Sequence, residues 1–377
     1  MDDIDMELER LQAGEVSKCQ PPRRPLKDYI LTHPDIIQKD IPPVEYLVGQ
    51  WLPKQSLGMV YAKPAVGKSW FCMAFGVALA RNDKRFLGWP INESVRSLYV
   101  DGEMSLSDLK DRFQKLSPKG LDYIDILPSE DMFLEGEPLS LDRPEHQEWF
   151  HQLLDDLDEA GRKPQLIVFD NLSTLRNSTN ENDNSETQKL VAWLVSLRAR
   201  GYTVLVVHHA GKNGDQRGAS ILTVPMNFVI KLTRSDEQAP VRDGETRFEV
   251  SFDKMRAKKP RPYEFAAFLG PDEAGVFQLT FSPTETNIEP RYRLLRHIGK
   301  RGDCGMGTHR EMAEAIEVGV GSIRNHLDKL LLEGFLAGQR AAPQISNEGW
   351  HLLNDFWPEE FSYTEQRRFV QEDDIPF

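Results

Sequence analysis

The stretch Leu57-Gly-Met-Val-Tyr-Ala-Lys-Pro-Ala-Val-Gly-Lys-Ser-Trp70 decides the fold of this chain. Residues 57–61 are a short apolar run that predicts a buried strand, and an apolar helical pattern covers residues 69–81. Residues 62–69 between them match a phosphate-binding loop (P-loop), which requires this order of strand, loop and helix. The backbone N–H groups of such a loop, with the N-terminus of its helix, form a cradle for anions. The stretch therefore predicts that the chain binds ATP together with Mg²⁺.

Individual positions of the loop have separate expected roles. Lys68 is expected to reach the β- and γ-phosphates, and Ser69 is expected to offer its hydroxyl to Mg²⁺. The first motif position holds Ala62 where glycine is usual, which matters only if the turn requires glycine. A chance match in an ordinary turn is the alternative. The predicted nucleotide-binding residues are Ala62, Lys63, Pro64, Ala65, Val66, Gly67, Lys68, Ser69 and Trp70.

Short apolar runs alternate with helical patterns after the loop, as in an α/β core. The runs are mostly unbroken, which is typical of parallel strands buried on both faces. They cover residues 97–101, 165–170, 203–208 and 228–232. The helical patterns cover residues 69–81, 105–116, 144–160 and 186–200. Three later runs, 248–254, 264–269 and 276–281, are predicted to be antiparallel and to close the edge of a mainly parallel, twisted sheet.

Charged residues lie where two of the predicted strands end. Asp170 is the expected Walker B carboxylate, which holds Mg²⁺ through its water shell, although a helix N-cap would look similar. Glu103 lies just past its strand, at the edge where open α/β sheets bind ligands, and is the expected general base for the attacking water. Asp101 competes for this role, but it still lies inside the strand, which favours a structural one.

A histidine pair, His208 and His209, ends the strand predicted at residues 203–208. It is interpreted as a sensor of the γ-phosphate, and the alternative is one packed and one solvated side chain. Residues 211–218 follow and are polar and rich in glycine, which predicts a mobile loop. This loop either grips a phosphate backbone or is a plain surface loop.

Over about residues 42–282 these blocks resemble the RecA-like core of hexameric helicases, above all plasmid RepA-type replicative helicases and related AAA-family ATPases of phages and plasmids. The likeness is carried by residues 62–69, 99–103, 166–170, 208–209 and 217–220. It implies that Glu103 is the catalytic base, that His209 senses the γ-phosphate, and that Arg217 is an arginine finger reaching a neighbour's ATP. Such a finger implies a head-to-tail ring, expected to be a hexamer of identical chains. The expected catalytic residues are thus Lys68, Glu103, His209 and Arg217, and the expected Mg²⁺ ligands are Ser69 and Asp170.

A second basic cluster follows the late strand at residues 248–254. Lys254 and Arg256 are rival finger residues, because RecA-like rings also place a basic pair of this region against the neighbouring nucleotide. Lys258, Lys259 and Arg261 are interpreted instead as a solvated, DNA-facing patch.

Residues 286–356 are expected to form a small winged helix-turn-helix domain. In its third helix, Arg324, Asn325 and His326 lie near the exposed start and are expected to contact duplex or fork DNA. A winged helix that docks a protein is the alternative, because this helix is only modestly basic. Three helical patterns and the entry to a β-wing lie at residues 290–298, 308–316, 320–333 and 334–339.

The last residues, Glu372-Asp-Asp-Ile-Pro-Phe377, resemble the acidic tip of bacterial single-stranded DNA-binding proteins. The resemblance implies that host proteins which bind such tips also bind this chain. The terminal carboxylate would pair with a cation, Phe377 would fill an apolar pocket, and the acidic residues would steer association. The residues involved are Asp373, Asp374, Ile375, Pro376 and Phe377.

Composition limits the class of protein. The 377 residues include 46 Lys and Arg against 59 Asp and Glu, a net charge of −13, which excludes a wholly basic nucleic-acid coat but not a local basic channel. No apolar run reaches the ~20 residues of a membrane span, so we expect no membrane association. Only three, widely spaced cysteines occur and the N-terminus is acidic, unlike a signal peptide, so we expect a cytoplasmic location. The expected domains are a flexible N-terminal arm (1–30), the ATPase core (31–285), the winged helix (286–356) and an acidic tail (357–377).

Together these features favour an ATP-hydrolysing motor on single-stranded DNA, a replicative helicase or translocase of a phage or other mobile element. Two other functions stay open at this point. One is a RecA-like recombination or repair mediator that uses ATP without unwinding DNA. The other is a DNA-binding regulator whose winged helix reads an operator under the control of ATP.

Overall fold

The computed structural model describes residues 25–176, 184–210, 220–234, 245–257, 264–282, 288–302, 305–339, 342–357 and 360–361. The chain divides into two compact units, Met1–Val44 and Glu45–Phe377. Four of the sequence predictions fall outside the described residues. They concern the loop 211–218 with Arg217, the basic residues Lys258, Lys259 and Arg261, the N-terminal arm before residue 25, and the tip from Asp373 to Phe377.

The described part of the first unit, from residue 25, contains two short helical elements, η1 (Leu26–Tyr29) and α2 (His33–Gln38). Thr32 begins α2 with a capping box. The Thr32 hydroxyl accepts the N–H of Asp35 at 3.3 Å, and the Asp35 carboxylate accepts the N–H of Thr32 at 2.9 Å. The start of α2 is therefore fixed by its own sequence.

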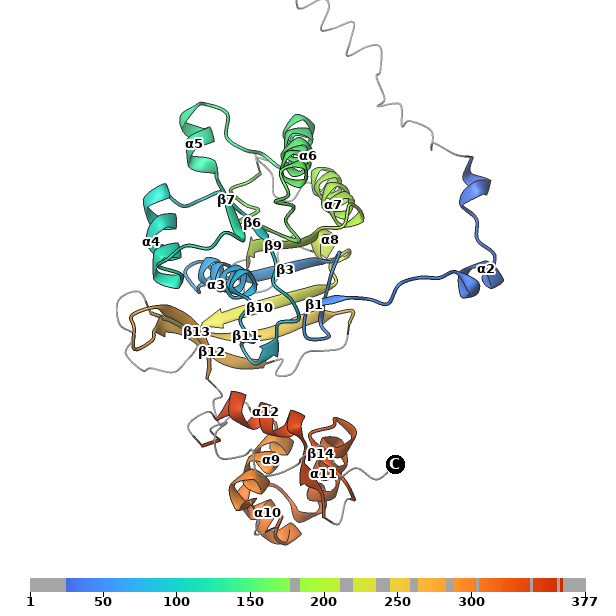
Figure 1. The fold of residues 1–377 in the computed structure, drawn as a ribbon, viewed down its shortest axis with the longest axis vertical. Coiled ribbons are helices and arrows are strands. Elements are labelled where there is room, and N and C mark those ends of the chain that lie inside the picture. Colours follow the sequence, from blue (N-terminus) through green and yellow to red (C-terminus); the bar gives the residue numbers. More distant parts are fainter. Residues whose placement is uncertain are drawn as a thin grey trace, which may run out of the picture. The chain divides into compact units, whose positions relative to one another are not determined.

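Within the described residues, a nine-stranded sheet forms the centre of the second unit, in the order β13-β12-β11-β10-β3-β9-β8-β6-β7 (Figure 1). The pairs from β10 to β7 are parallel, whereas β10, β11, β12 and β13 pair in antiparallel fashion. The predicted α/β class, with a mainly parallel sheet closed by antiparallel strands, is confirmed. The strands are β3 (Leu57–Ala62), β6 (Ser97–Asp101), β7 (Ile124–Pro128), β8 (Leu166–Asp170), β9 (Thr203–His209), β10 (Phe228–Arg234), β11 (Thr246–Met255), β12 (Glu264–Pro271) and β13 (Phe277–Ser282).

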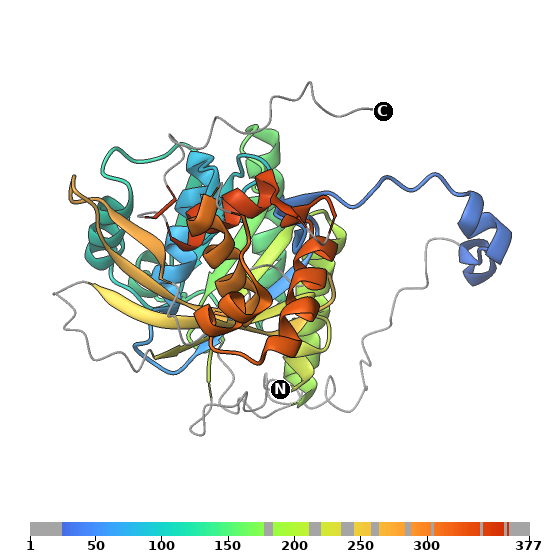
Figure 2. The same cartoon turned by 90° about the horizontal axis from the view of Figure 1, so that it is seen from below.

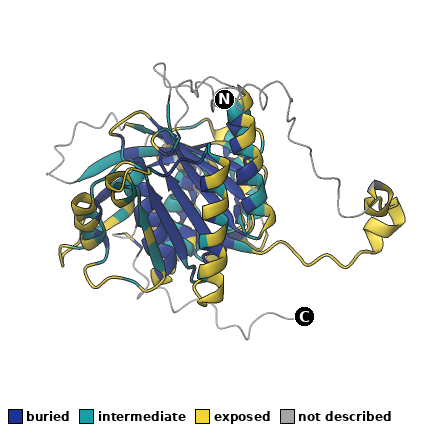
Figure 3. Cartoon of the chain, turned by 90° about the horizontal axis from the view of Figure 1, so that it is seen from above, coloured by how far each residue is buried: buried dark blue, intermediate teal, exposed yellow. Residues whose placement is uncertain are grey.

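Helices cover both faces of this sheet, which is why its central strands are apolar on both sides (Figure 3). Successive side chains of a strand point to opposite faces, so Val60 of β3 packs in one apolar core and Met59 in the other. The core of Val60 is shared with α3 (Lys68–Arg81) and α4 (Leu106–Leu116). The core of Met59 is shared with α6 (Pro144–Glu159) and α7 (Asn184–Ala199).

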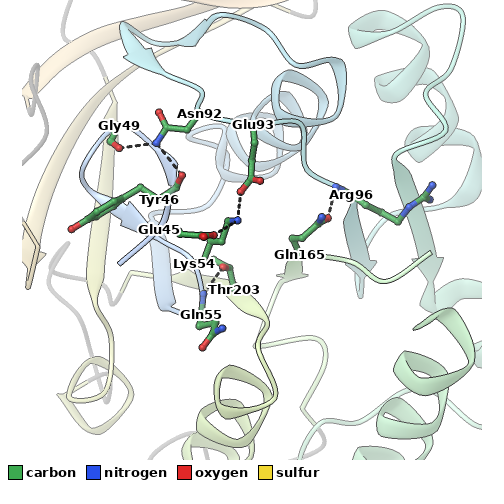
Figure 4. Close-up of polar contacts among 10 residues, drawn as sticks. All are labelled: Glu45, Tyr46, Gly49, Lys54, Gln55, Asn92, Glu93, Arg96, Gln165 and Thr203. Atoms are coloured by element: carbon green, nitrogen blue, oxygen red, sulfur yellow. Dashed lines mark hydrogen bonds and ion pairs between the residues drawn. The ribbon is translucent and has the colours of Figure 1, made fainter. Parts of the chain in front are cut away.

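The amino ends of the central strands are joined by side-chain-to-backbone hydrogen bonds (Figure 4). The N–H of Gln55 donates to the Thr203 hydroxyl at 3.1 Å, which joins the start of β3 to β9. The N–H of Arg96 donates to the Gln165 side chain at 2.8 Å, which joins the start of β6 to that of β8. Short strands and helices complete this unit up to residue 282: β1 (Tyr46–Val48), β2 (Leu52–Pro53), β4 (Arg85–Phe86), β5 (Trp89–Pro90), α5 (Ser129–Leu134) and α8 (Ser220–Thr223).

The described residues between 288 and 361 form a helical group with its own apolar core (Figure 2, orange to red). Its helices are α9 (Pro290–Arg301), α10 (His309–Ala315), η3 (Val320–Ser322), α11 (Ile323–Leu332) and α12 (Asn347–Phe356), and β14 (Leu336–Ala337) pairs with β15 (Gln344–Ile345). Three helices followed by a strand pair have the predicted order, and their assignment as a winged helix-turn-helix stays a prediction. α12 was not predicted from the sequence.

Most predicted elements lie within two residues of the observed ones. The main omissions are β7 and α12, and the short elements α2, α5, α8, β1, β2, β4 and β5 were not predicted either. β7 is the edge strand, and its residues are only partly buried, so its sequence lacks a strong apolar run. In the part of the chain that the structure describes, no helix is both long and apolar enough to span a bilayer.

Candidate nucleotide site

The phosphate-binding loop connects the end of β3 to the start of α3. Gly67 is the N-cap of α3 and has a φ of +115°, a conformation that favours glycine. A Cβ atom on Gly67 would also lie 3.0 Å from a ring carbon of Phe248. Ala62 is buried at the end of β3, so the absence of glycine at the first motif position is compatible with this loop. The departure from the usual motif is therefore explained.

Lys68 folds back over the loop that precedes it. Its Nζ donates to the carbonyl oxygens of Ala62 at 3.4 Å and of Lys63 at 3.3 Å. Burial lowers the pKa of Lys68, and the nearby carboxylates of Asp170 and Glu103 act in the opposite direction. The Lys68 ammonium thus lies against the loop and makes two long hydrogen bonds to carbonyl oxygens. Phosphate oxygens are well suited to replace these carbonyl oxygens as its partners.

His209 lies beside Lys68 because of the strand register. β9 pairs with β3 so that His209 lies opposite Ala62, and the Nζ of Lys68 is 3.1 Å from the Nδ1 of His209. An ammonium can only donate, so Nδ1 accepts and the proton of the neutral ring is on Nε2. By the same register, His208 lies opposite Tyr61. Of the two histidines, His209 is the one next to the P-loop lysine.

Asp170 ends β8 and is almost fully buried, with 2% of its surface exposed. The Tyr99 hydroxyl donates to its Oδ2 at 2.5 Å, and Ser69 also bonds to this carboxylate. Burial raises the pKa of Asp170, whereas Tyr99, Ser69 and Lys68 lower it. The two predicted Mg²⁺ ligands, Ser69 and Asp170, are therefore in direct contact. Tyr99 was given no role in the sequence analysis, because it lies in the middle of an apolar strand.

Asp101 and Glu103 have different environments at the end of β6. Asp101 is buried and lies beside Asp170 in the register of β6 and β8. Its Oδ2 accepts the N–H of Glu103 at 3.1 Å and of Met104 at 2.8 Å, and burial raises its pKa to about 7. Glu103 is exposed, and its Oε2 accepts from the Nδ2 of Asn171 at 2.5 Å. This geometry suits a structural role for Asp101 and leaves Glu103 as the accessible carboxylate.

The Trp70 side chain packs away from the loop. Its ring stacks on Phe277 with centroids 6.0 Å apart, and the guanidinium of Arg112 lies 5.1 Å from its centre. Trp70 therefore joins α3 to α4 and β13, and it could serve a nucleotide through its backbone alone.

The rival finger residues Lys254 and Arg256 contact their own chain. The Nζ of Lys254 donates to the carbonyl oxygens of Thr223 at 2.6 Å and Val224 at 3.0 Å. The guanidinium of Arg256 donates to the carbonyl of Val224 at 2.6 Å. Both side chains thus hold the end of α8, directly after the loop that contains Arg217.

The carboxyl ends of β3, β6, β8 and β9 therefore bring together Lys68, Asp101, Asp170 and His209.

Residues 20–215, slightly more than half of the chain, match the family described as AAA domain. The structure is similar to a KaiC-like protein from the archaeon Pyrococcus horikoshii (14% identity, TM-score 0.42, covering 63% of this chain and 99% of that chain). It is also similar to the flagellar accessory protein FlaH from Methanocaldococcus jannaschii (14% identity, TM-score 0.39, covering 60% and 90%). No curated protein matches the sequence. With its phosphate-binding loop inside the matched residues, the chain is a P-loop protein that belongs to the AAA-domain family.

Proposed function

We propose that this ATPase hydrolyses ATP as a motor on single-stranded DNA and works as a head-to-tail ring of identical chains. The observation that carries the hydrolytic part is the meeting of Lys68, Asp170 and His209 at adjacent strand ends, with Glu103 just beyond them. The DNA-motor part is supported by the resemblance to RepA-type replicative helicases.

In the hydrolytic site, each residue has a task that its position allows. The loop N–H groups and Lys68 bind the phosphates, and Lys68 exchanges its carbonyl contacts for phosphate oxygens. Glu103 accepts a proton from the attacking water. His209 contacts Lys68, so a change in the position of the lysine on phosphate release reaches β9 directly.

The oxygen donors next to the loop fit a Mg²⁺ ion. The hydroxyl of Ser69 and the carboxylate of Asp170 are in contact, and oxygen atoms are the ligands that Mg²⁺ prefers. A bound Mg²⁺ would neutralise charge on the phosphates. Because Mg²⁺ in such sites keeps several waters and phosphate ligands, two protein oxygens are sufficient.

Arg217 is proposed to complete the site of the neighbouring chain. Lys254 and Arg256 already bond to carbonyl groups of their own chain, which favours Arg217 as the finger. The Arg217→Ala variant should bind ATP normally and lose hydrolysis by about 1000-fold, as expected for an arginine finger. The matched control is Lys254→Ala. A larger loss of hydrolysis in Lys254→Ala than in Arg217→Ala would make Lys254 the finger residue in place of Arg217.

DNA contact is proposed for the loop 211–218 and for α11. Arg324 and Asn325 are exposed on α11, whereas His326 is half-buried and has a pKa lowered by burial, so the first two are the better contact residues. Replacing both by alanine should weaken binding of forked DNA. Unchanged DNA binding would favour protein docking by this helical group.

The decisive experiment measures ATP hydrolysis with and without single-stranded DNA, together with strand separation on a forked duplex. We expect DNA to stimulate hydrolysis and strands to separate. Stimulated hydrolysis without strand separation on any substrate would assign the protein to recombination mediators instead. A strict monomer in the presence of ATP and single-stranded DNA would remove both the ring and the motor.

Recruitment of host proteins through the tip is a separate proposal that rests on the sequence of residues 372–377. Deletion of Phe377 should abolish capture of proteins that bind the tails of single-stranded DNA-binding proteins. Equal capture by the deleted and the full chain would overturn it.

A further inference from the structure

The backbone around Glu103 is fixed from two sides. The N–H of Gly102 donates to the carbonyl of Asp170 at 2.8 Å, and Asp101 accepts the N–H groups of Glu103 and Met104. A Cβ atom on Gly102 would lie 2.7 Å from side-chain atoms of both Leu175 and Thr174, so the turn lies directly on the segment that follows β8. The main chain of the proposed base therefore has little freedom of its own.

The side chain of Glu103 is free to rotate unless something holds it, because it is exposed. Asn171 supplies such a contact, with its Nδ2 2.5 Å from the Oε2 of Glu103. Asn171 is 1% exposed, and its other amide atom, Oδ1, accepts the N–H of Thr174 at 3.2 Å. Since Oδ1 must face that N–H, the NH₂ group must face Glu103. The Thr174 hydroxyl also donates to the carbonyl of Asn171 at 3.0 Å.

We propose that Asn171 is a positioning residue that aims the carboxylate of Glu103 for catalysis. Its amide occupies Oε2, which leaves Oε1 to take the proton of the attacking water. Asn171 directly follows Asp170, so one short segment both binds the proposed metal and holds the base. The inference rests on the proposed role of Glu103 as the general base.

Asn171→Asp tests this role with almost no change in volume. The aspartate keeps an oxygen for the N–H of Thr174 but loses the donor to Glu103 and faces it with a like charge. We expect kcat to fall by about 10-fold to 100-fold, while KM and the affinity for a fluorescent ATP analogue change by less than about 2-fold. Thr174→Val is the matched control. It removes the hydroxyl that bonds to the Asn171 carbonyl and, at 3.4 Å, to Oδ1, but it keeps the backbone N–H that holds Oδ1 and the amide that donates to Glu103. Its kcat should stay within about 3-fold of the wild type.

The double variant Asn171→Asp/Glu103→Gln separates this inference from the proposed function. If Asn171 acts through Glu103, the double variant is no slower than Glu103→Gln alone. Two results would overturn the positioning role of Asn171 and leave the proposed function intact. One is loss of ATP hydrolysis in Glu103→Gln with an unchanged kcat in Asn171→Asp, and the other is a lower kcat in the double variant than in Glu103→Gln. Wild-type hydrolysis by Glu103→Gln would overturn the proposed function itself. If Asn171→Asp shows no cooperative thermal unfolding transition and is therefore not folded, the same comparisons are made with Asn171→Ala. The expected results for that variant are identical.

Discussion

At the amino ends of the central strands, Lys54 pairs with Glu45 at 2.6 Å and with Glu93 at 2.7 Å, and these hydrogen bonds raise its pKa (Figure 4). At the carboxyl ends, Lys68 is buried against carbonyl groups and His209, and burial lowers its pKa. The same sheet thus holds one lysine whose partners stabilise its charge and another whose surroundings oppose it. Asp170 interacts with the second lysine, and Asp101 lies beside Asp170 in the register of β6 and β8. Burial opposes the charge of both carboxylates.

The difference indicates that the two ends of the strands serve different purposes. Hydrogen bonds at the amino ends join neighbouring segments and contribute to folding. Buried ionisable groups at the carboxyl ends lower the stability of the free protein, and bound phosphates with Mg²⁺ would offset that loss. Substitutions at the two ends should therefore have opposite effects on activity and stability.

The largest expected effect is the loss of activity in Lys68→Met. ATP hydrolysis should fall by about 1000-fold, since the β- and γ-phosphates lose their cation. The melting temperature should be unchanged or higher, because methionine fills the space without a buried charge. In the matched control Lys54→Met, hydrolysis should stay within about 2-fold and the free energy of unfolding should fall by about 0.5 kcal/mol, as for a partly exposed ion pair. A strongly lowered melting temperature of Lys68→Met would show that the buried Lys68 stabilises the free protein, contrary to this expectation.

Asp101→Asn should change how stability depends on pH. The folded carboxyl has a pKa of about 7, and the unfolded one titrates near pH 4. Between these values the folded protein keeps a proton that the unfolded chain has released, so the free energy of unfolding decreases as pH rises through this window. Asparagine lacks this titration, so the melting temperature of the variant relative to the wild type should rise between pH 5 and pH 8. Parallel curves for the two proteins would show that Asp101 does not titrate in this range.

The smallest expected effect on activity belongs to Asn92→Ala at the amino ends. The Nδ2 of Asn92 donates to the carbonyl oxygens of Tyr46 and Gly49, both at 2.9 Å (Figure 4). Both bonds are exposed to solvent, so their loss should lower the free energy of unfolding by about 1 kcal/mol. ATP hydrolysis should be unaffected at temperatures where the variant is folded. A decrease in kcat for ATP would show that the amino ends also influence the site.

The strands that bury apolar residues on both faces could be located from the sequence. The runs that became β3, β6, β8 and β9 were located because parallel strands with helices on both sides are apolar throughout. β7 was missed because an edge strand needs fewer apolar residues, and Ile124-Asp-Ile-Leu-Pro128 has an acid at its second position. Lys68 and Asp170 were predicted as site residues from local patterns, the P-loop motif and the end of an apolar strand.

Contacts between distant strand ends could not be derived in this way. The approach of His209 to Lys68 depends on the register of β3 and β9, which no local pattern specifies. Asn171 follows a strand and reads as an ordinary turn residue, so its bond to Glu103 is visible only in the structure. The roles of Arg217 and of the tip at Phe377 still rest on the sequence.

We propose that the carboxyl ends of these strands form a hydrolytic site with Glu103 as its base. Single-turnover hydrolysis by Glu103→Gln, measured beside the binding of ATP with Mg²⁺, tests it most directly. We expect ATP to bind with wild-type affinity while its hydrolysis slows by about 100-fold or more. Hydrolysis at the wild-type rate, with ATP bound normally, would show that Glu103 is not the base.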